Sequence, residues 1–170
     1  MLSACSGDDN SDKNGDPKLK SNTETVSITS PSAGSGLLNA GTLMVKVFVD
    51  GNSNAVASST VDTITDTVKL NVTVAVGSHT FKLIFEYSDP MYGGPFLLAY
   101  TDSETVNVTK GSDQTIAFTS TDFIYEDLDN DGFTNLSELH PSRYTDPTDS
   151  TCVADKSIMA GALVNGCTLG

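Results

Sequence analysis

The sequence predicts a mainly β protein: an antiparallel β-sandwich followed by a short acidic C-terminal segment. Its 170 residues contain 38% apolar residues and no Trp, and Thr, Ser and Val recur throughout, which is typical of sheets and turns. Apolar and polar residues alternate in short runs, separated by turn signals about every ten residues. The length suffices for one ordinary domain with appendages.

The first three alternating runs are rich in valine. The first ends at the turn cluster SPSAGSG, and the second ends at Asp50-Gly51-Asn52, a turn signal. Because side chains on a strand alternate between its two faces, the apolar members of each run share one face. In chain order they are Val26 and Ile28; Val45, Val47 and Val49; and Val68, Leu70, Val72, Val74 and Val76.

The later runs carry more aromatic residues. Gly77-Ser78 precedes the fourth run, and Lys110-Gly111-Ser112-Asp113 separates the last two. The alternation predicts about seven or eight strands in all, so an antiparallel β-sandwich is expected. The apolar members are Phe81, Leu83, Phe85 and Tyr87; Phe96, Leu98 and Tyr100; Val106 and Val108; and Ile116 and Phe118.

The start of this region resembles the first two strands of bacterial immunoglobulin-like domains. Those strands read Ile-x-x-Pro-x-x-Gly, then a glycine, then alternating valines, a pattern carried here by Ile28, Pro31, Gly34 and Gly41. The resemblance implies an immunoglobulin-like β-sandwich over residues 25–121. It implies a fold and not a function.

The charge and the histidines limit the classes of function. The formal net charge is -13, so a nucleic-acid backbone would be repelled and nucleic acid is not expected as a partner. His79 and His140 are the two histidines, and no Ser-His-Asp or Cys-His set can be assembled around them. We therefore expect a protein that binds or builds and is not an enzyme.

The N-terminus contains Leu-Ser-Ala-Cys at residues 2–5, which resembles the lipobox of bacterial lipoproteins. The resemblance implies lipidation at Cys5, and Ser6 in place of an aspartate implies the outer membrane, with the protein at the cell surface or extracellular. The alternative is an incidental cysteine. Residues 1–24 then form the lipobox remnant and a polar, disordered tether. No apolar run is long enough to span a bilayer, so membrane contact is expected through the lipid alone.

Residues 127–138, DLDNDGFTNLSE, match the EF-hand calcium loop. In that loop, positions 1, 3 and 5 supply side-chain oxygens, position 6 is glycine, position 7 supplies a backbone carbonyl, position 9 binds directly or through water, and position 12 is a glutamate. Calcium prefers six to eight hard oxygens, and it would offset the repulsion among the carboxylates. The alternative is a solvated acidic turn. The matching residues, in order, are Asp127, Asp129, Asp131, Gly132, Phe133, Asn135 and Glu138.

The surroundings of the loop, residues 122–170, resemble type 3 thrombospondin repeats of bacterial surface proteins. The residues before the loop, TDFIYE, are too short for the entering helix of an EF-hand, whereas NLSELH after it can form a helical turn or two. The motif continues with Thr-Asp-Pro at residues 145–147, Cys152, and Gly-Cys at residues 166–167. The resemblance implies a calcium-stabilised segment, although this chain has one acidic loop where the family usually has several.

Two further features of this segment are open to more than one interpretation. A disulfide between Cys152 and Cys167 would close a loop of about 15 residues and stabilise it by about 3 kcal/mol. The rival interpretation is a zinc site, for which two thiols are too few ligands. Asp146 and Asp149 either bind a second ion or have cap and turn roles.

The aromatic stretch at residues 86–100 suggests an alternative function. Tyr87, Phe96 and Tyr100 continue the strand alternation and are expected in the core. Tyr92 lies at the expected loop tip, where it could stack on a sugar ring. The main expectation is an adhesion or assembly component that contacts a surface protein, or itself, through exposed strand edges. The alternative is a carbohydrate-binding module that contacts a glycan through Tyr92.

Overall fold

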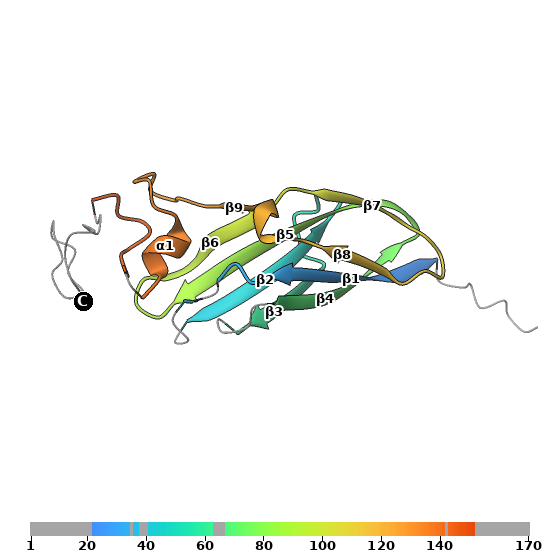
Figure 1. The fold of residues 1–170 in the computed structure, drawn as a ribbon, viewed down its shortest axis with the longest axis horizontal. Helices are drawn as coiled ribbons and strands as arrows, with labels where there is room; N and C mark the ends of the chain where they lie inside the picture. The colour runs from blue at the N-terminus through green and yellow to red at the C-terminus, as the bar shows by residue number, and fades with distance from the viewer. Residues whose placement is uncertain (1–21, 35, 38–40, 63–66, 142, 152–170) are drawn as a thin grey trace, which may run out of the picture.

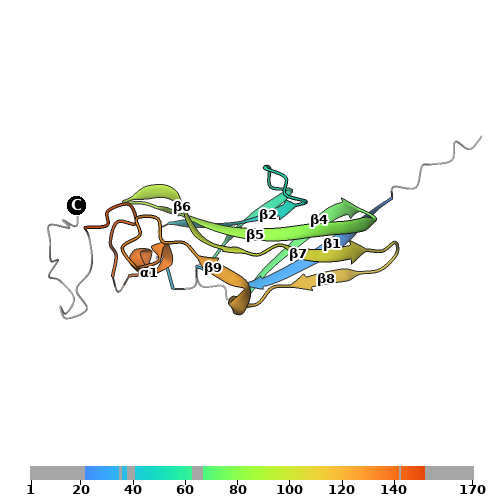
Figure 2. The same cartoon turned by 90° about the horizontal axis from the view of Figure 1, so that it is seen from above.

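The alternating runs form strands that pack as two sheets, one above the other (Figures 1 and 2). The structure is a computed structural model, and it describes residues 22–34, 36–37, 41–62, 67–141 and 143–151. The predictions for Cys5, for the Cys152–Cys167 bond and for most of the tether lie outside the described residues. Among the described residues, no helix is both long and apolar enough to cross a membrane.

The smaller sheet has three strands in the order β4-β1-β8, and the larger has six, in the order β3-β2-β5-β6-β9 with β7 also paired to β5. A short helix, α1, follows the last strand. The elements are β1 (Thr23–Pro31), β2 (Thr42–Val49), β3 (Ala57–Val61), β4 (Thr67–Ala75), β5 (Gly77–Asp89), β6 (Gly93–Thr101), β7 (Glu104–Val108), β8 (Gln114–Ala117), the 3-10 turn η1 (Ser120–Asp122), β9 (Phe123–Tyr125) and α1 (Asn135–Leu139).

The core lies between the two sheets and confirms the predicted alternation. Along β5, four alternate side chains, from Phe81 to Tyr87, are fully buried. Val45 and Val47 of β2 are equally buried beside them, and Val26 of β1 faces them from the smaller sheet. Burying a large apolar side chain contributes roughly 1.5–3 kcal/mol, so this alternation fixes which face of each strand turns inward.

A bulge in β6 makes the core prediction for Tyr100 wrong. Phe85 pairs with Ala99 and Glu86 pairs with Leu97, so Leu98 is the extra residue of the bulge. Leu98 and Ala99 are both fully buried, and beyond them the inward positions shift by one residue. The ring of Tyr100 therefore lies on the outer face, under the Lys82 Nζ at 4.4 Å.

The pairing of β8 departs from the predicted antiparallel pattern, because β8 runs parallel to β1. Two strands were not expected at all. Strand β3 is an edge strand of Ser and Thr in which only Val61 is buried, so it shows no alternation. Strand β9 has three residues and pairs with β6, which extends the larger sheet beyond the boundary expected at residue 121.

Candidate metal centre

The acidic loop lies between β9 and α1, at the end of the sandwich opposite the start of β1 (Figure 1). The N–H of Glu126 donates to the carbonyl of Leu98, which continues the contact between β9 and β6 up to the loop. After the loop, Thr134 caps α1 by accepting from the N–H of Ser137. The expected short exit helix is confirmed. The stretch before the loop, expected to be too short for an entering helix, forms β9 where an EF-hand would have that helix.

Each of the three aspartates uses one carboxylate oxygen to shape the loop. Asp127 Oδ2 accepts from the N–H of Gly132 at 3.0 Å. Asp129 Oδ1 accepts from the N–H of Asp131 at 3.2 Å, and Asp131 Oδ1 accepts from the N–H of Phe133 at 2.8 Å. These bonds close successive tight turns in the loop.

The second oxygen of each aspartate is buried and has no hydrogen-bond partner. These atoms are Asp127 Oδ1, Asp129 Oδ2 and Asp131 Oδ2. The three carboxylates can each offer an oxygen within 4.8 Å of the others. Among the described residues, these three aspartates form a group of side chains that could hold a metal ion.

Glu138, on α1, is a fourth buried carboxylate, but it lies outside the group of three aspartates whose oxygens come within 4.8 Å of one another. Its side chain is fully buried, its Oε1 accepts from the hydroxyl of Thr145 at 3.2 Å, and its Oε2 has no partner. Burial raises the pKa of Glu138 to about 8, with a further contribution from the negative charges of Asp129 and Asp131. Burial also raises the pKa of Asp129. A carboxylate with these properties requires either a proton or a cation.

The backbone of the loop turns through left-handed conformations that the sequence accommodates. Gly132 has φ = +92° and Asn130 has φ = +60°. Glycine adopts such angles without steric cost, and Asn tolerates them better than most residues. The glycine expected at position 6 of the loop therefore lies where the chain reverses.

Asn135 holds the loop against the sheet. Its Nδ2 donates to the carbonyl of Leu97 at 2.7 Å, and its Oδ1 accepts from the N–H of Leu128 at 3.0 Å. Its N–H donates to the carbonyl of Glu126. The side chain is fully buried, and its amide is occupied by backbone groups. That Asn135 also supplies an oxygen to an ion stays a prediction.

Phe133, whose carbonyl is the expected ligand at position 7, is covered by the segment after α1. The guanidinium of Arg143 lies 3.5 Å from the centre of the Phe133 ring, a favourable cation–π contact. The carbonyl ligand itself stays a prediction. The stacking connects the loop to the residues that follow α1.

These residues also contact Glu138 and the hairpin between β5 and β6. The N–H of Thr145 donates to the carbonyl of Glu138 at 2.9 Å, in addition to the hydroxyl bond already described. The hydroxyl of Tyr144 donates to the buried carboxylate of Asp89, at 3.0 Å from Oδ1. Burial, with this hydrogen bond, raises the pKa of Tyr144 to about 12. The sequence did not single out Thr145 or Asp89, although Thr145 belongs to the quoted Thr-Asp-Pro motif.

Tyr92 also packs against Tyr144, so it is not a free residue at the loop tip. Its hydroxyl donates to the carbonyl of Tyr144, and the two rings are 5.3 Å apart. The half-buried ring of Tyr92 thus packs on the chain's own C-terminal segment. A contact between Tyr92 and a glycan stays a prediction, and this packing does not favour it.

Asp146 and Asp149 have the turn roles that the sequence allows. Asp146 Oδ1 accepts from the N–H and hydroxyl of Thr148, and Asp149 Oδ1 accepts from those of Thr151.

His79, in β5, is held between two acceptors: its Nδ1 lies 2.7 Å from Asp50 Oδ2, and its Nε2 lies 2.9 Å from the carbonyl of Ala75.

Comparisons of the chain with protein-family models, with curated proteins and with solved structures find no match. The observations thus identify a mainly β protein of two packed sheets, with an Asp127, Asp129 and Asp131 group that could hold a metal ion.

Proposed function

We propose that this chain is a calcium-stabilised binding or structural protein of the cell surface, in which the ion fixes the C-terminal segment against the sandwich. One observation carries the proposal: three aspartates of the loop, whose oxygens come within 4.8 Å of one another, and Glu138 in the helix after them each bury an unpartnered carboxylate oxygen. Solvated acidic turns keep their oxygens in water, whereas buried charges are normally paired or coordinate metals.

The donor set favours calcium over other metals. All the donors are hard oxygens, as Ca²⁺ and Mg²⁺ require, and the group has no thiol or imidazole of the kind that zinc prefers. The loop's spacing suits the six to eight ligands of calcium better than the strict octahedron of magnesium. We expect a dissociation constant of about 10⁻⁴ to 10⁻³ M, the range of extracellular structural sites.

The finer parts of the proposal have separate support. For an immunoglobulin-like sandwich, the pairs β1–β4, β2–β5 and β5–β6 match the neighbours B–E, C–F and F–G of that fold. For an outer-membrane lipoprotein, the support is the Leu-Ser-Ala-Cys motif ending at Cys5. A tether before β1 would leave the metal-bearing end of the sandwich facing away from the membrane (Figure 1).

Titration calorimetry on the full chain tests the ion. We expect saturable binding of CaCl₂, weaker binding of MgCl₂, and affinity roughly tenfold or more lower in Glu138→Gln, because the variant removes one ligand charge. The matched control is Glu104→Gln, an exposed glutamate of β7 far along the chain from the loop. No binding at about 10 mM calcium, or equal affinities in Glu138→Gln and Glu104→Gln, would overturn the proposal.

A further inference from the structure

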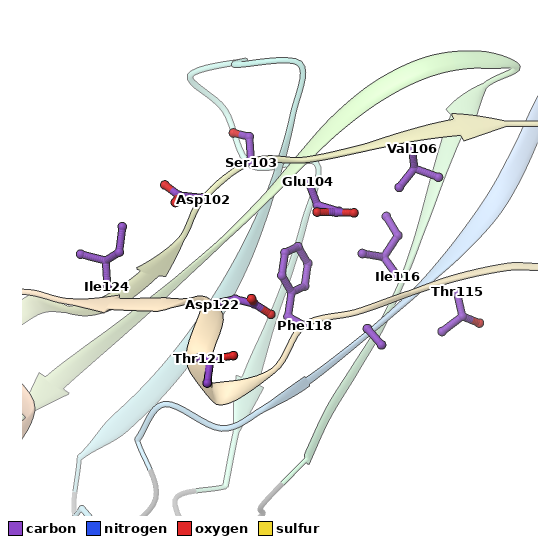
Figure 3. A pocket seen from close by; sticks show the side chains of 11 residues that line it. Asp102, Ser103, Glu104, Val106, Thr115, Ile116, Phe118, Thr121, Asp122 and Ile124 are labelled. Carbon is purple, nitrogen blue, oxygen red and sulfur yellow. The ribbon is translucent and has the colours of Figure 1, made fainter.

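Two strand edges face each other across an open side of the sandwich (Figure 3). On one side is β8, the edge of the smaller sheet, and on the other is β7, which pairs with β5. Between them lies a cavity of about 380 Å³, closed at one end by η1 and the start of β9.

The cavity has a few apolar side chains on its inner side, while most of its exposed lining is polar. Ile116 and Phe118 project into it from the β8 side, and Val106 projects from β7 (Figure 3). Ile124 stands at the closed end with 40% of its surface exposed. The apolar contact that a bound segment could make here is therefore small, and it is limited to these side chains.

The outer edge of β8 has backbone groups available for pairing. Phe118 N–H donates to the carbonyl of Thr29 in β1 at 2.9 Å. Since alternate residues of a strand direct their backbone groups to opposite edges, Thr115 and Ala117 direct theirs away from β1. No strand among the described residues pairs with this edge. Such an edge is a template for an added strand.

The rim of the cavity is acidic. Asp102, Glu104 and Asp122 line it and are exposed, and its described lining contains no Lys, Arg or His. Asp122 is held in place by the N–H and hydroxyl of Thr119. The rim therefore favours cationic side chains and disfavours anionic ones.

We propose that this cleft binds an extended segment of a partner protein in which Lys or Arg alternates with apolar residues, added as a strand along the outer edge of β8. The apolar side chains of the segment would face Ile116, Phe118 and Val106, and the cationic ones would reach the rim, since alternate residues of a strand face opposite sides. This proposal rests on the proposed binding function and specifies the surface and the kind of partner involved. The calcium loop does not line the cleft, so the two proposals can fail separately.

The probe is a fluorescein-labelled synthetic peptide in which lysine alternates with valine, with glutamate in place of lysine in a second peptide. Fluorescence anisotropy is measured against the full chain in calcium. We expect saturable binding of the lysine peptide that weakens as salt is added, and no binding of the glutamate peptide. Absence of saturable binding, or equal binding of both peptides, overturns the proposal and identifies the acids as guards against edge-to-edge aggregation.

Substitutions then separate strand addition from charge attraction. The double variant Asp102→Asn/Glu104→Gln should bind the lysine peptide roughly threefold to tenfold more weakly, whereas Asp113→Asn, an exposed acid outside the cleft, should not. Ala117→Pro removes an outward N–H on an edge strand without touching the ladder to β1, and it should weaken binding about tenfold or more.

Each result of this series decides the proposal. Unchanged binding by an Ala117→Pro protein with a normal melting temperature overturns strand addition. If that variant fails to fold, the double variant decides, and unchanged affinity overturns the proposal. Glu138→Gln should bind the peptide as the unsubstituted protein does, so a failed calcium site leaves this result intact.

Discussion

Raising the pH should destabilise the ion-free protein, and calcium should remove most of that dependence. The reason is Glu138, whose pKa is about 8 in the folded chain against an ordinary value of 4.5. Below the ordinary value, both folded and unfolded chains hold the proton. As the pH rises, the unfolded chain releases its proton first, so stability falls until the pH passes the folded value.

The magnitude follows from the two pKa values. A single proton held only by the folded state changes the free energy of unfolding by about 1.4 kcal/mol per pH unit. For Glu138, the expected loss of stability between about pH 6 and about pH 8 is on the order of 2 kcal/mol. Bound calcium takes the place of the proton, so in excess calcium the Glu138 part of this slope should vanish.

Urea denaturation followed by circular dichroism, in EDTA and in calcium, measures the effect. Glu138→Gln is the control, because its amide does not titrate and the slope in EDTA should shrink. His79 contributes a slope of the same sign: Asp50 raises its pKa, so its stabilisation is present below the ordinary value of 6.5 and is lost as the pH rises. That part persists in the variant. If the unfolding free energy in EDTA changes with pH equally steeply in the unsubstituted protein and in Glu138→Gln, the reasoning is refuted.

Three further predictions concern packing around the site. Gly132→Ala should lower the unfolding free energy of the calcium-loaded protein by about 1 kcal/mol, because φ is +92° there; urea denaturation measures it, and no change would contradict the loop geometry. Gly41→Ala should destabilise the fold by about 1–3 kcal/mol, since its Cβ would collide with the hydroxyl of Tyr87; an unchanged melting temperature would count against that contact. Tyr144→Phe should cost about 1–2 kcal/mol by removing a donor to buried Asp89, and amide exchange at residues 143–146 should speed up; unaltered exchange there would show that the hydroxyl does not hold the segment.

The sandwich was predictable where one face of a strand is buried along its whole length. The alternation from Phe81 to Tyr87 places these residues in the core without knowledge of their neighbours. Tyr100 could not be placed in this way, because the bulge at Leu98 depends on the partner strand. The parallel pairing of β1 with β8 likewise joins segments far apart in the sequence and has no local signature.

The acidic loop was predictable because its donors fall within twelve consecutive residues and at fixed spacing. The contacts that hold the loop and the segment after it in place could not be predicted in the same way. Thr145 reaches Glu138, and Tyr144 reaches Asp89, only after α1 turns the chain back against the β5–β6 hairpin. The same turn covers the ring of Tyr92, which the sequence alone suggested would be exposed.

The two ends of the described chain leave from opposite ends of the long axis of the sandwich (Figure 1). Tension applied between them would meet very different resistance at each end. At one end β1 lies between β4 and β8, so a pull along it shears two ladders at once. At the other end the load reaches the contacts of Tyr144 and Thr145 first. These few hydrogen bonds should yield before the ladders of β1, and an ion bound beside Glu138 would raise the force at which the segment peels away.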